Sequence, residues 1–429
     1  MELPQANHST FKSYLFFWSG QLVSLLGSSV VQFVLIWWIT LETGSAFYLA
    51  LASFLGLVPM VVLGPLTGVF ADRVNRKLLI FTADFLQAMA TVVLIILFFF
   101  GFASLWIVLT LLTVRGVFQA FHQPTTNAII PSMVPADKLS RMNGLNYLFT
   151  GAVYMVGPVL AAVLLSFWAV SQALWIDVAT FSVAVIPLLL IRIPSVRSEQ
   201  VVRDSSFKID FKEGFSFILA TRGFLPLLIL ATMLNFLLTP ASTLLPYFVK
   251  FVHSGGVDDL ALVMAAFQGG ILIGGLVMTM MKGFQRKMLA IACAIYIVFL
   301  GYAIVALTPL GLFWFMAAGG ALMTLCIPVA NVCIQTIMQT IVPLKMLGRV
   351  NSVVMALASA ATPAGMILSG VVVQFISTSH FFLVCTALGV IVLTTAWLFT
   401  DVRHVNKNLP SNSQSSILAS QNMSAHNGN

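Results

Sequence analysis

The chain has 429 residues, of which 59% are hydrophobic and only 8% are charged, and its mean hydropathy is +1.01. Soluble domains carry about 25% charged residues, so this composition excludes a water-soluble fold. The formal net charge of +8 does not indicate nucleic acid as a partner, because the basic residues stand between long apolar segments. The expected partner of such residues is the anionic surface of a lipid bilayer.

Apolar segments long enough to cross a bilayer recur along the chain, and each crossing needs about 20 residues. The sequence predicts such segments at 13–39, 46–70, 78–100, 104–127, 142–166, 170–191, 224–249, 259–281, 288–308, 311–337, 347–376 and 379–400. Short segments of alternating hydrophobicity, typical of a membrane barrel, do not occur in the sequence. We therefore predict an all-α polytopic membrane protein with about twelve transmembrane helices.

Two pairs of similar segments indicate that the chain consists of two related halves. Residues 64–77 have a degraded copy at 274–287, an offset of 210 positions. Residues 134–143 match residues 342–351 at an offset of 208 positions. Repeated halves of membrane helices are typical of secondary transporters, so the pattern predicts two pseudo-symmetric six-helix halves.

The predicted spans divide the chain into a short tail, two bundles joined by a linker, and a disordered second tail. The boundaries are 1–12 for the first tail, 13–191 for the first bundle, 192–223 for the linker, 224–400 for the second bundle and 401–429 for the last tail. Part of the linker fits an amphipathic helix on the membrane surface. Its apolar face would consist of Phe207, Phe211, Phe215 and Ile218.

Lysine and arginine are distributed unevenly between the connections. Nineteen of the 21 lie in the tails and in one set of connections, Lys250 lies in the other set, and Arg115 lies inside a span. Cytoplasmic connections carry the excess of basic residues in membrane proteins. We therefore predict that both termini and the linker are cytoplasmic.

The connection between the second and third spans resembles the signature loop of the Major Facilitator Superfamily. The matching residues are Gly64, Gly68, Asp72, Arg73, Arg76 and Lys77. We expect glycine to allow close approach of helices, the aspartate to pair with a base or cap a helix, and the basic residues to hold the loop on the anionic leaflet. Asn75 stands where the family has glycine, and asparagine tolerates a left-handed backbone.

Further resemblances lie in the fourth and fifth spans. Arg115 is similar to the buried arginine of the superfamily, although Gln119 stands where the family has glycine. Gly144, Gly157 and Pro158 align with the motif of its exporting antiporters.

Residues 20–25, 43–46, 120–124 and 176–177 are similar to bacterial macrolide-efflux-type proteins, a drug:proton antiporter branch of the superfamily. The resemblance covers residues 12–400. It implies two bundles that rock around a central cavity, in a bacterial cytoplasmic membrane.

Charged residues inside the spans are candidates for function, because a charge in the bilayer is costly. Asp84 and Asp177 are the predicted proton-coupling groups, since burial raises a carboxylate pKa toward the range where it alternates between forms. His122 is a third candidate. Arg115 cannot lose its proton, so it would tune a carboxylate or bind an anionic group.

Structural alternatives stay open for the three titratable residues. Asp84 could pair with the signature-loop arginines, Asp177 could bond to a neighbouring helix, and His122 could make a hydrogen bond at a kink near Pro124. Polar and aromatic residues from both halves would line the cargo cavity. The candidates are Gln21, Gln32, Trp37, Asn235, Gln268, Asn331 and Gln335. The alternative for each is an ordinary interhelical hydrogen bond.

Neither a phosphate-binding loop nor a constellation of nucleophile, base and acid occurs in the sequence. We therefore predict a non-enzymatic transporter without cofactor or metal, driven by a proton gradient. It would act as a monomer and export a hydrophobic or amphipathic, macrolide-like compound in exchange for protons by alternating access. The alternatives are an exporter or flippase of an endogenous lipid or siderophore, and a non-transporting membrane sensor.

Overall fold

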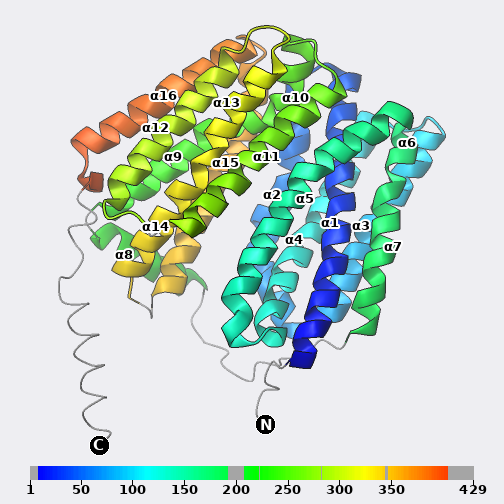
Figure 1. The fold of residues 1–429 in the computed structure, drawn as a ribbon, viewed down its shortest axis with the longest axis horizontal. Coiled ribbons are helices and arrows are strands. Elements are labelled where there is room, and N and C mark those ends of the chain that lie inside the picture. Colours follow the sequence, from blue (N-terminus) through cyan, green and yellow to red (C-terminus); the bar gives the residue numbers. More distant parts are fainter. Residues whose placement is uncertain (1–7, 192–206, 222, 282, 344–345, 404–429) are drawn as a thin grey trace, which may run out of the picture.

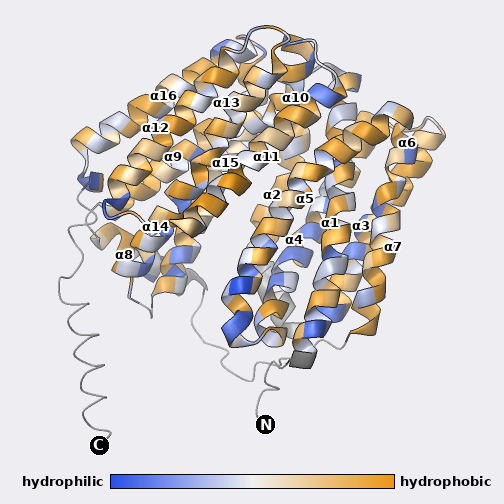
Figure 2. Ribbon diagram, in the orientation of Figure 1, coloured by the Kyte–Doolittle hydropathy of each residue, from blue (hydrophilic) through white to orange (hydrophobic). Residues whose placement is uncertain are grey.

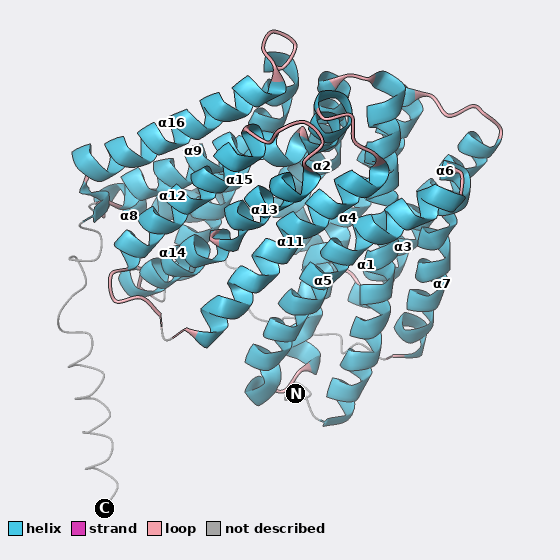
Figure 3. Cartoon of the chain, turned by 45° about the horizontal axis from the view of Figure 1, so that its top comes forward, coloured by secondary structure: helices cyan, strands magenta, loops and turns pink. Residues whose placement is uncertain are grey.

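The structure is a computed structural model that describes residues 8–191, 207–221, 223–281, 283–343 and 346–403. Within these ranges the chain folds into helices and short connections without strands (Figure 3). Twelve helical segments are long and apolar enough to cross a membrane, which confirms the predicted fold class. The predicted disordered tail after residue 403 and the first part of the linker lie outside the described residues.

The first six spans form one bundle (Figure 1). They are α1 (His8–Thr43), α2 (Ala46–Arg73), α3 (Arg76–Phe99), α4 (Leu105–Met133), α5 (Leu139–Phe167) and the pair α6 (Val170–Ala173) and α7 (Trp175–Leu190). A 3-10 turn, η1 (Ala136–Lys138), precedes α5. Hydrophobic residues predominate along most of these helices (Figure 2), as expected for segments that cross a bilayer.

The other six spans form the second bundle. They are α9 (Phe224–Thr243) with α10 (Leu245–Tyr247) and the π-helix η2 (Phe248–Val252), α11 (Val257–Met280), α12 (Lys287–Ala306), α13 (Phe313–Leu325) with α14 (Ile327–Ile341), α15 (Leu347–Val372) and α16 (Thr378–Phe399). The sequence did not predict the breaks at Leu244 and Cys326. Pro246 and Pro328 each follow a break within two residues, where a missing N–H costs little.

The two bundles meet through small residues. A Cβ atom placed on Gly370 of α15 would lie 2.6 Å from Cβ of Ala50 and 3.0 Å from Cα of Phe47, both on α2. One placed on Gly275 of α11 would lie 2.9 Å from the ring of Tyr147 on α5. Glycine at these points allows α2 and α5 to approach the second bundle closely.

The predicted linker helix is present as α8 (Phe207–Ala220), but its apolar face contacts protein. Ile218 is fully buried in a cluster with Val350 and Val353 of α15, and Phe211 and Phe215 pack against the same cluster. The placement on the membrane surface predicted for this face is therefore wrong. The side chain of Phe207 lies outside the described residues.

Polar contacts also attach α8 to the second bundle. Glu213 and Arg349 form an ion pair, and a Cβ atom on Gly214 would lie 2.8 Å from the carbonyl oxygen of Arg349. The helix therefore belongs to the second bundle rather than to a free connection.

The connection from α2 to α3 uses its polar residues to cap helices. Asn75 has φ −60°, so the chain does not use the left-handed backbone that asparagine tolerates. Its side chain instead caps α3 and accepts hydrogen bonds from the N–H groups of Lys77 (3.0 Å) and Leu78 (3.4 Å). Lys77 Nζ donates to the carbonyls of Leu189 (2.7 Å) and Ile191 (2.8 Å) at the end of α7. These carbonyls are unpaired helix-end acceptors that attract a cation.

Arg76 acts similarly and donates from Nη1 to the carbonyl of Ala128 on α4 at 3.0 Å. Arg76 and Lys77 thus bind protein carbonyls where lipid contact was predicted. Gly64 has no atom within 4 Å of a Cβ position, so it makes no close helix contact. The side chains of Asp72 and Arg73 and the surroundings of Gly68 lie outside the described residues, and their roles stay predictions.

Candidate functional site

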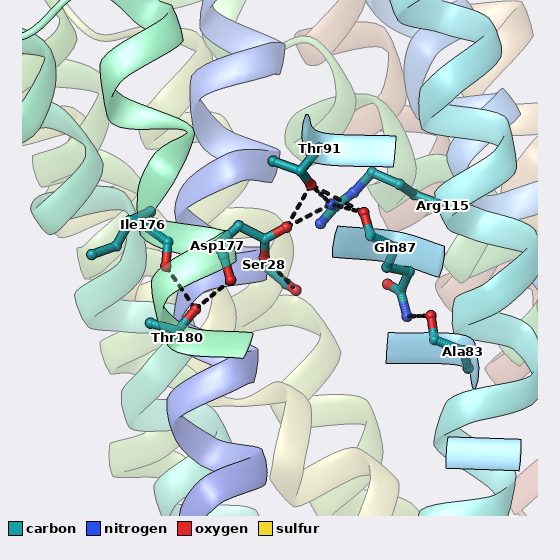
Figure 4. A network of polar contacts seen from close by, with 8 residues as sticks. All are labelled: Ser28, Ala83, Gln87, Thr91, Arg115, Ile176, Asp177 and Thr180. Carbon is teal, nitrogen blue, oxygen red and sulfur yellow. Dashed lines mark hydrogen bonds and ion pairs between the residues drawn. The ribbon is translucent and has the colours of Figure 1, made fainter. Parts of the chain in front are cut away.

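The first bundle buries an ion pair between α4 and α7. Nη1 of Arg115 lies 2.7 Å from Oδ2 of Asp177, and the two residues are 7% and 4% exposed. Thr91 donates its hydroxyl to the same oxygen at 2.5 Å, and Ser28 donates to Oδ1 at 3.1 Å (Figure 4). The carboxylate therefore accepts bonds from α1, α3 and α4.

Arg115 has further acceptors, which hold the guanidinium in place. It donates to the hydroxyl of Thr91 and to the carbonyl of Gln87 at 3.2 Å (Figure 4). Of the two predicted roles, this geometry favours tuning of a carboxylate. It also bears out the predicted bond between Asp177 and a neighbouring helix.

A second polar cluster joins α1, α3 and α4. Nε2 of His122 lies 3.1 Å from Oδ1 of Asp84 and 2.9 Å from Oε1 of Gln21. Gln21 in turn donates from Nε2 to Oδ2 of Asp84 at 3.3 Å. His122 thus makes the suggested hydrogen bond near Pro124, with Gln21 as its partner. The described partners of Asp84 are His122 and Gln21, whereas the side chain of Arg73 in the signature loop lies outside the described residues.

The two clusters lie at two levels of the bundle, which we call layers, and the same number of residues separates them on each helix. Each of three helices contributes to both layers at positions seven residues apart: Gln21 and Ser28, Asp84 and Thr91, and His122 and Arg115. Seven residues are close to two helical turns, or about 10.5 Å along the axis. The same face of each helix therefore carries both layers.

Two cavities adjoin the layers within the described part of the chain, and a third shares wall residues with the second. The first, of about 30 Å³, is lined by Asp84, His122 and Asp177. The second, of about 260 Å³, is lined by Arg115 and by Gln268 of α11, and it shares Gln87 and Gln119 with the first. Cavity walls therefore extend from the buried charges to Gln268 at the boundary between the bundles.

The third cavity, of about 330 Å³, is lined from both halves. Its walls include Gln32 and Ser53 of the first half and Ser242, Thr243 and Met366 of the second. Gln32 and Gly56 line both this cavity and the second one. Apolar walls with a few hydrogen-bonding groups are typical of sites for small molecules.

The predicted cargo residues divide into two groups. Gln32 and Gln268 line the central cavities, and Gln21 belongs to the layer of Asp84. Trp37 is buried away from the three cavities, with Nζ of Lys250 5.9 Å from its ring centroid. The others are exposed and outside these cavities: Asn235, Asn331 and Gln335. Asn235 instead donates to the carbonyl of Ala231, one turn earlier on α9.

Only part of the predicted antiporter motif shapes the site. Pro158 lines the second cavity. A Cβ atom on Gly157 would overlap the side chain of Ser29, so glycine is needed where α5 crosses α1. Gly144 has no atom within 4 Å of its Cβ position.

Several site residues were missed in the sequence. Ser28 and Thr91 carried a usable signal, because each lies seven residues from a candidate on its own helix. Gln87 and Gln119 lie between the layers but were not recognised. Thr243 had no local signal, since most span threonines only bond to their own helix.

Twelve spans in two bundles, with buried charges beside cavities between them, define a secondary transporter. The profile of the transmembrane secretion effector family of Major Facilitator Superfamily transporters matches residues 6–428, and the chain belongs to this family. It is a multi-pass membrane transporter and not an enzyme.

Several known proteins are similar to this chain in sequence. Macrolide efflux protein A of Streptococcus pyogenes is 31% identical over 389 residues, covering 91% of this chain and 96% of that protein. The protein of the same name from Enterococcus faecalis is 31% identical over 323 residues, which cover 75% of this chain and 100% of that protein. The Staphyloferrin A transporter of Staphylococcus aureus is 25% identical over 271 residues, which cover 60% of this chain and 64% of that protein.

Solved structures agree in fold. The nucleoside transporter NupG superposes with a TM-score of 0.68 at 15% identity, over 90% of this chain and 98% of that chain. A bacterial homologue of the iron transporter ferroportin in an inward-facing state also gives 0.68, at 16% identity, over 90% and 98%. At this identity the likeness concerns the fold alone.

Proposed function

We propose that this transporter exports a hydrophobic or amphipathic, macrolide-like compound in exchange for protons by alternating access. The observation that carries the coupling is the buried pair of Asp177 and Arg115 beside the cavity. The relatives named for macrolide efflux support the cargo, because they are more similar and covered more fully than the siderophore transporter.

Protonation of Asp177 supplies the switch. In its ionised form Asp177 attracts Arg115 and accepts bonds from Thr91 and Ser28, which holds α7 against three other helices. A proton on the carboxyl removes the charge and one acceptor site, so it weakens this attachment. A ligand shifts a conformational equilibrium only through a difference in interaction energy between the states, and this change in pairing is such a difference.

The layer of Asp84 and His122 provides a second proton-accepting station. It lies one layer nearer the end of the bundle that carries Arg76 and Lys77, which is the predicted cytoplasmic end. The 30 Å³ cavity touches both carboxylates. Protons would therefore leave Asp177 toward the cytoplasm through this region, while cargo occupies the larger cavities.

The site favours this cargo over the alternatives. An anionic lipid or siderophore would need a free cation, but Arg115 is already bonded to Asp177, Thr91 and Gln87. A sensor without transport would not need buried charges beside a cavity shared by two bundles. The proton gradient would supply the energy for export. The protein would act as a monomer in a bacterial cytoplasmic membrane, with both termini in the cytoplasm.

Efflux of a labelled macrolide from cells tests the proposal, with and without a protonophore. Export by the wild type should stop when the gradient is discharged, and Asp177→Asn should abolish export at normal membrane abundance. Asp137→Asn removes an exposed carboxylate on η1 and should export normally. Proton-driven export by Asp177→Asn would refute the coupling role. An inactive wild type in the membrane would refute the macrolide and favour the lipid or siderophore.

A further inference from the structure

Thr243 is the one threonine on α9 whose hydroxyl is left without a partner. It is 4% exposed, and its Oγ1 makes no hydrogen bond within the described protein. On the same helix, Thr232 and Thr239 donate to the carbonyls of Leu228 (2.9 Å) and Asn235 (2.7 Å). The carbonyl four residues before Thr243 belongs to Thr239, and it accepts from Ser242 at 3.0 Å instead.

A buried hydroxyl without a partner is unfavourable, so native proteins seldom retain one without a reason. Thr243 could lose its hydroxyl at no cost to the hydrogen bonds of α9. A partner that comes from outside the protein is therefore the simplest reason for the hydroxyl.

The helix breaks at the same place and supplies a second polar group. α9 ends at Thr243, α10 begins at Leu245, and the π-helix η2 follows. Pro246 has no N–H, so the carbonyl of Ser242 lacks its usual donor four residues later. π-Helical turns and broken spans are frequent at functional sites of membrane proteins.

The polar groups that line the cavity at this break are all neutral. Ser242 and Thr243 face Gln32 and Ser53 across about 330 Å³. Charged side chains are not found among the described residues that line it. Its hydroxyl, amide and carbonyl groups match ligand hydroxyl, ester or ether oxygens better than an ionised group, because an unpaired charge would be desolvated here.

We propose that Ser242 and Thr243, opposite Gln32 and Ser53, form a cargo subsite for the neutral, oxygen-bearing part of the transported molecule. This inference rests on the proposed function and adds the chemistry by which cargo is recognised. Because the walls come from both halves, cargo in the subsite contacts both bundles at once. Proton coupling and cargo recognition then use different residues in neighbouring cavities that share Gln32 and Gly56.

The test is equilibrium binding to the purified full-length protein, with tritiated erythromycin and with ethidium, a cation without oxygen atoms. Thr243→Val keeps the shape and removes the hydroxyl; it should weaken erythromycin binding about fivefold, the effect of one lost hydrogen bond. Ethidium binding should not change, and thermal stability should not fall. Thr232→Val is the matched control, and Thr243→Ser should restore erythromycin binding.

Three results would overturn the subsite: unchanged erythromycin binding by Thr243→Val, equal weakening of both compounds, or failure of Thr243→Ser to restore binding. If Thr243→Val does not fold, the same comparison is made with Thr243→Ala. Normal export and binding by the wild type together with any of these results would leave the proposed function standing. A wild type that neither binds nor exports erythromycin would refute the proposed function and the subsite with it.

Discussion

Neutralising the pair of Arg115 and Asp177 should reveal how strongly each charge depends on the other. The perturbations are Asp177→Asn, Arg115→Gln and the double variant, which keep similar shapes and remove charge. Both residues are less than 10% exposed and their charged atoms are 2.7 Å apart. Removing one partner of a buried pair costs about 3–5 kcal/mol, because the other charge stays buried alone, whereas replacing both is often nearly neutral.

The size of the effect in a thermal unfolding experiment follows from the length of the chain. An unfolding entropy of about 2.1 cal/mol/K per residue over 429 residues gives about 0.9 kcal/mol per kelvin. Each single variant should therefore lower Tm by about 3–6 °C. The double variant should recover most of this loss, to within about 2 °C of the wild type.

The assay is thermal unfolding of purified protein in one detergent, followed by tryptophan fluorescence. Glu213→Gln is the matched control, since it breaks a pair in which Glu213 is 47% exposed. Solvent screens such pairs to about 0–1 kcal/mol, so its Tm should change by about 1 °C or less. A stable Asp177→Asn, or a double variant as unstable as the two singles combined, would refute the reasoning.

Two further predictions concern pH and helix packing. Burial against Phe248 and Phe313 lowers the pKa of His253 below its usual 6.5. Its contribution to stability is therefore complete above the unfolded-state pKa and is lost as pH falls below it. Between pH 7.5 and 5, Tm should fall more for the wild type than for His253→Gln; equal slopes would contradict this. Gly157→Ala should lower Tm because the new methyl overlaps Ser29, an overpacking cost of about 1–3 kcal/mol. Gly144→Ala places its methyl in open space and should leave Tm unchanged. An equal fall in Tm for both variants would show that the close approach of α5 to α1 is unimportant.

The hydrophobic pattern alone was enough to predict the membrane fold. Each span must satisfy its own backbone hydrogen bonds in lipid, so length and hydropathy suffice to identify a helix. The breaks at Leu244 and Cys326 escaped this reasoning, because a short interruption inside a long apolar segment does not change its average hydropathy. The linker helix was predicted from its periodicity, which shows that one face is apolar but not what covers that face.

The candidate site divides in the same way. Its rare charges, Asp84, Arg115 and Asp177, were evident in the sequence because a bilayer makes any charge conspicuous. Their partners were not evident, since Arg115 and Asp177 are 62 positions apart and His122 and Gln21 are 101 apart. The sequence by itself determined which charges enter the membrane, because hydropathy identifies each span and the residues within it. It did not determine their partners, because the hydropathy of a span is the same whichever helix packs against it. Only the packing of α1, α3, α4 and α7 decided which of them meet, because pairing depends on the rotation and height of each helix in the bundle.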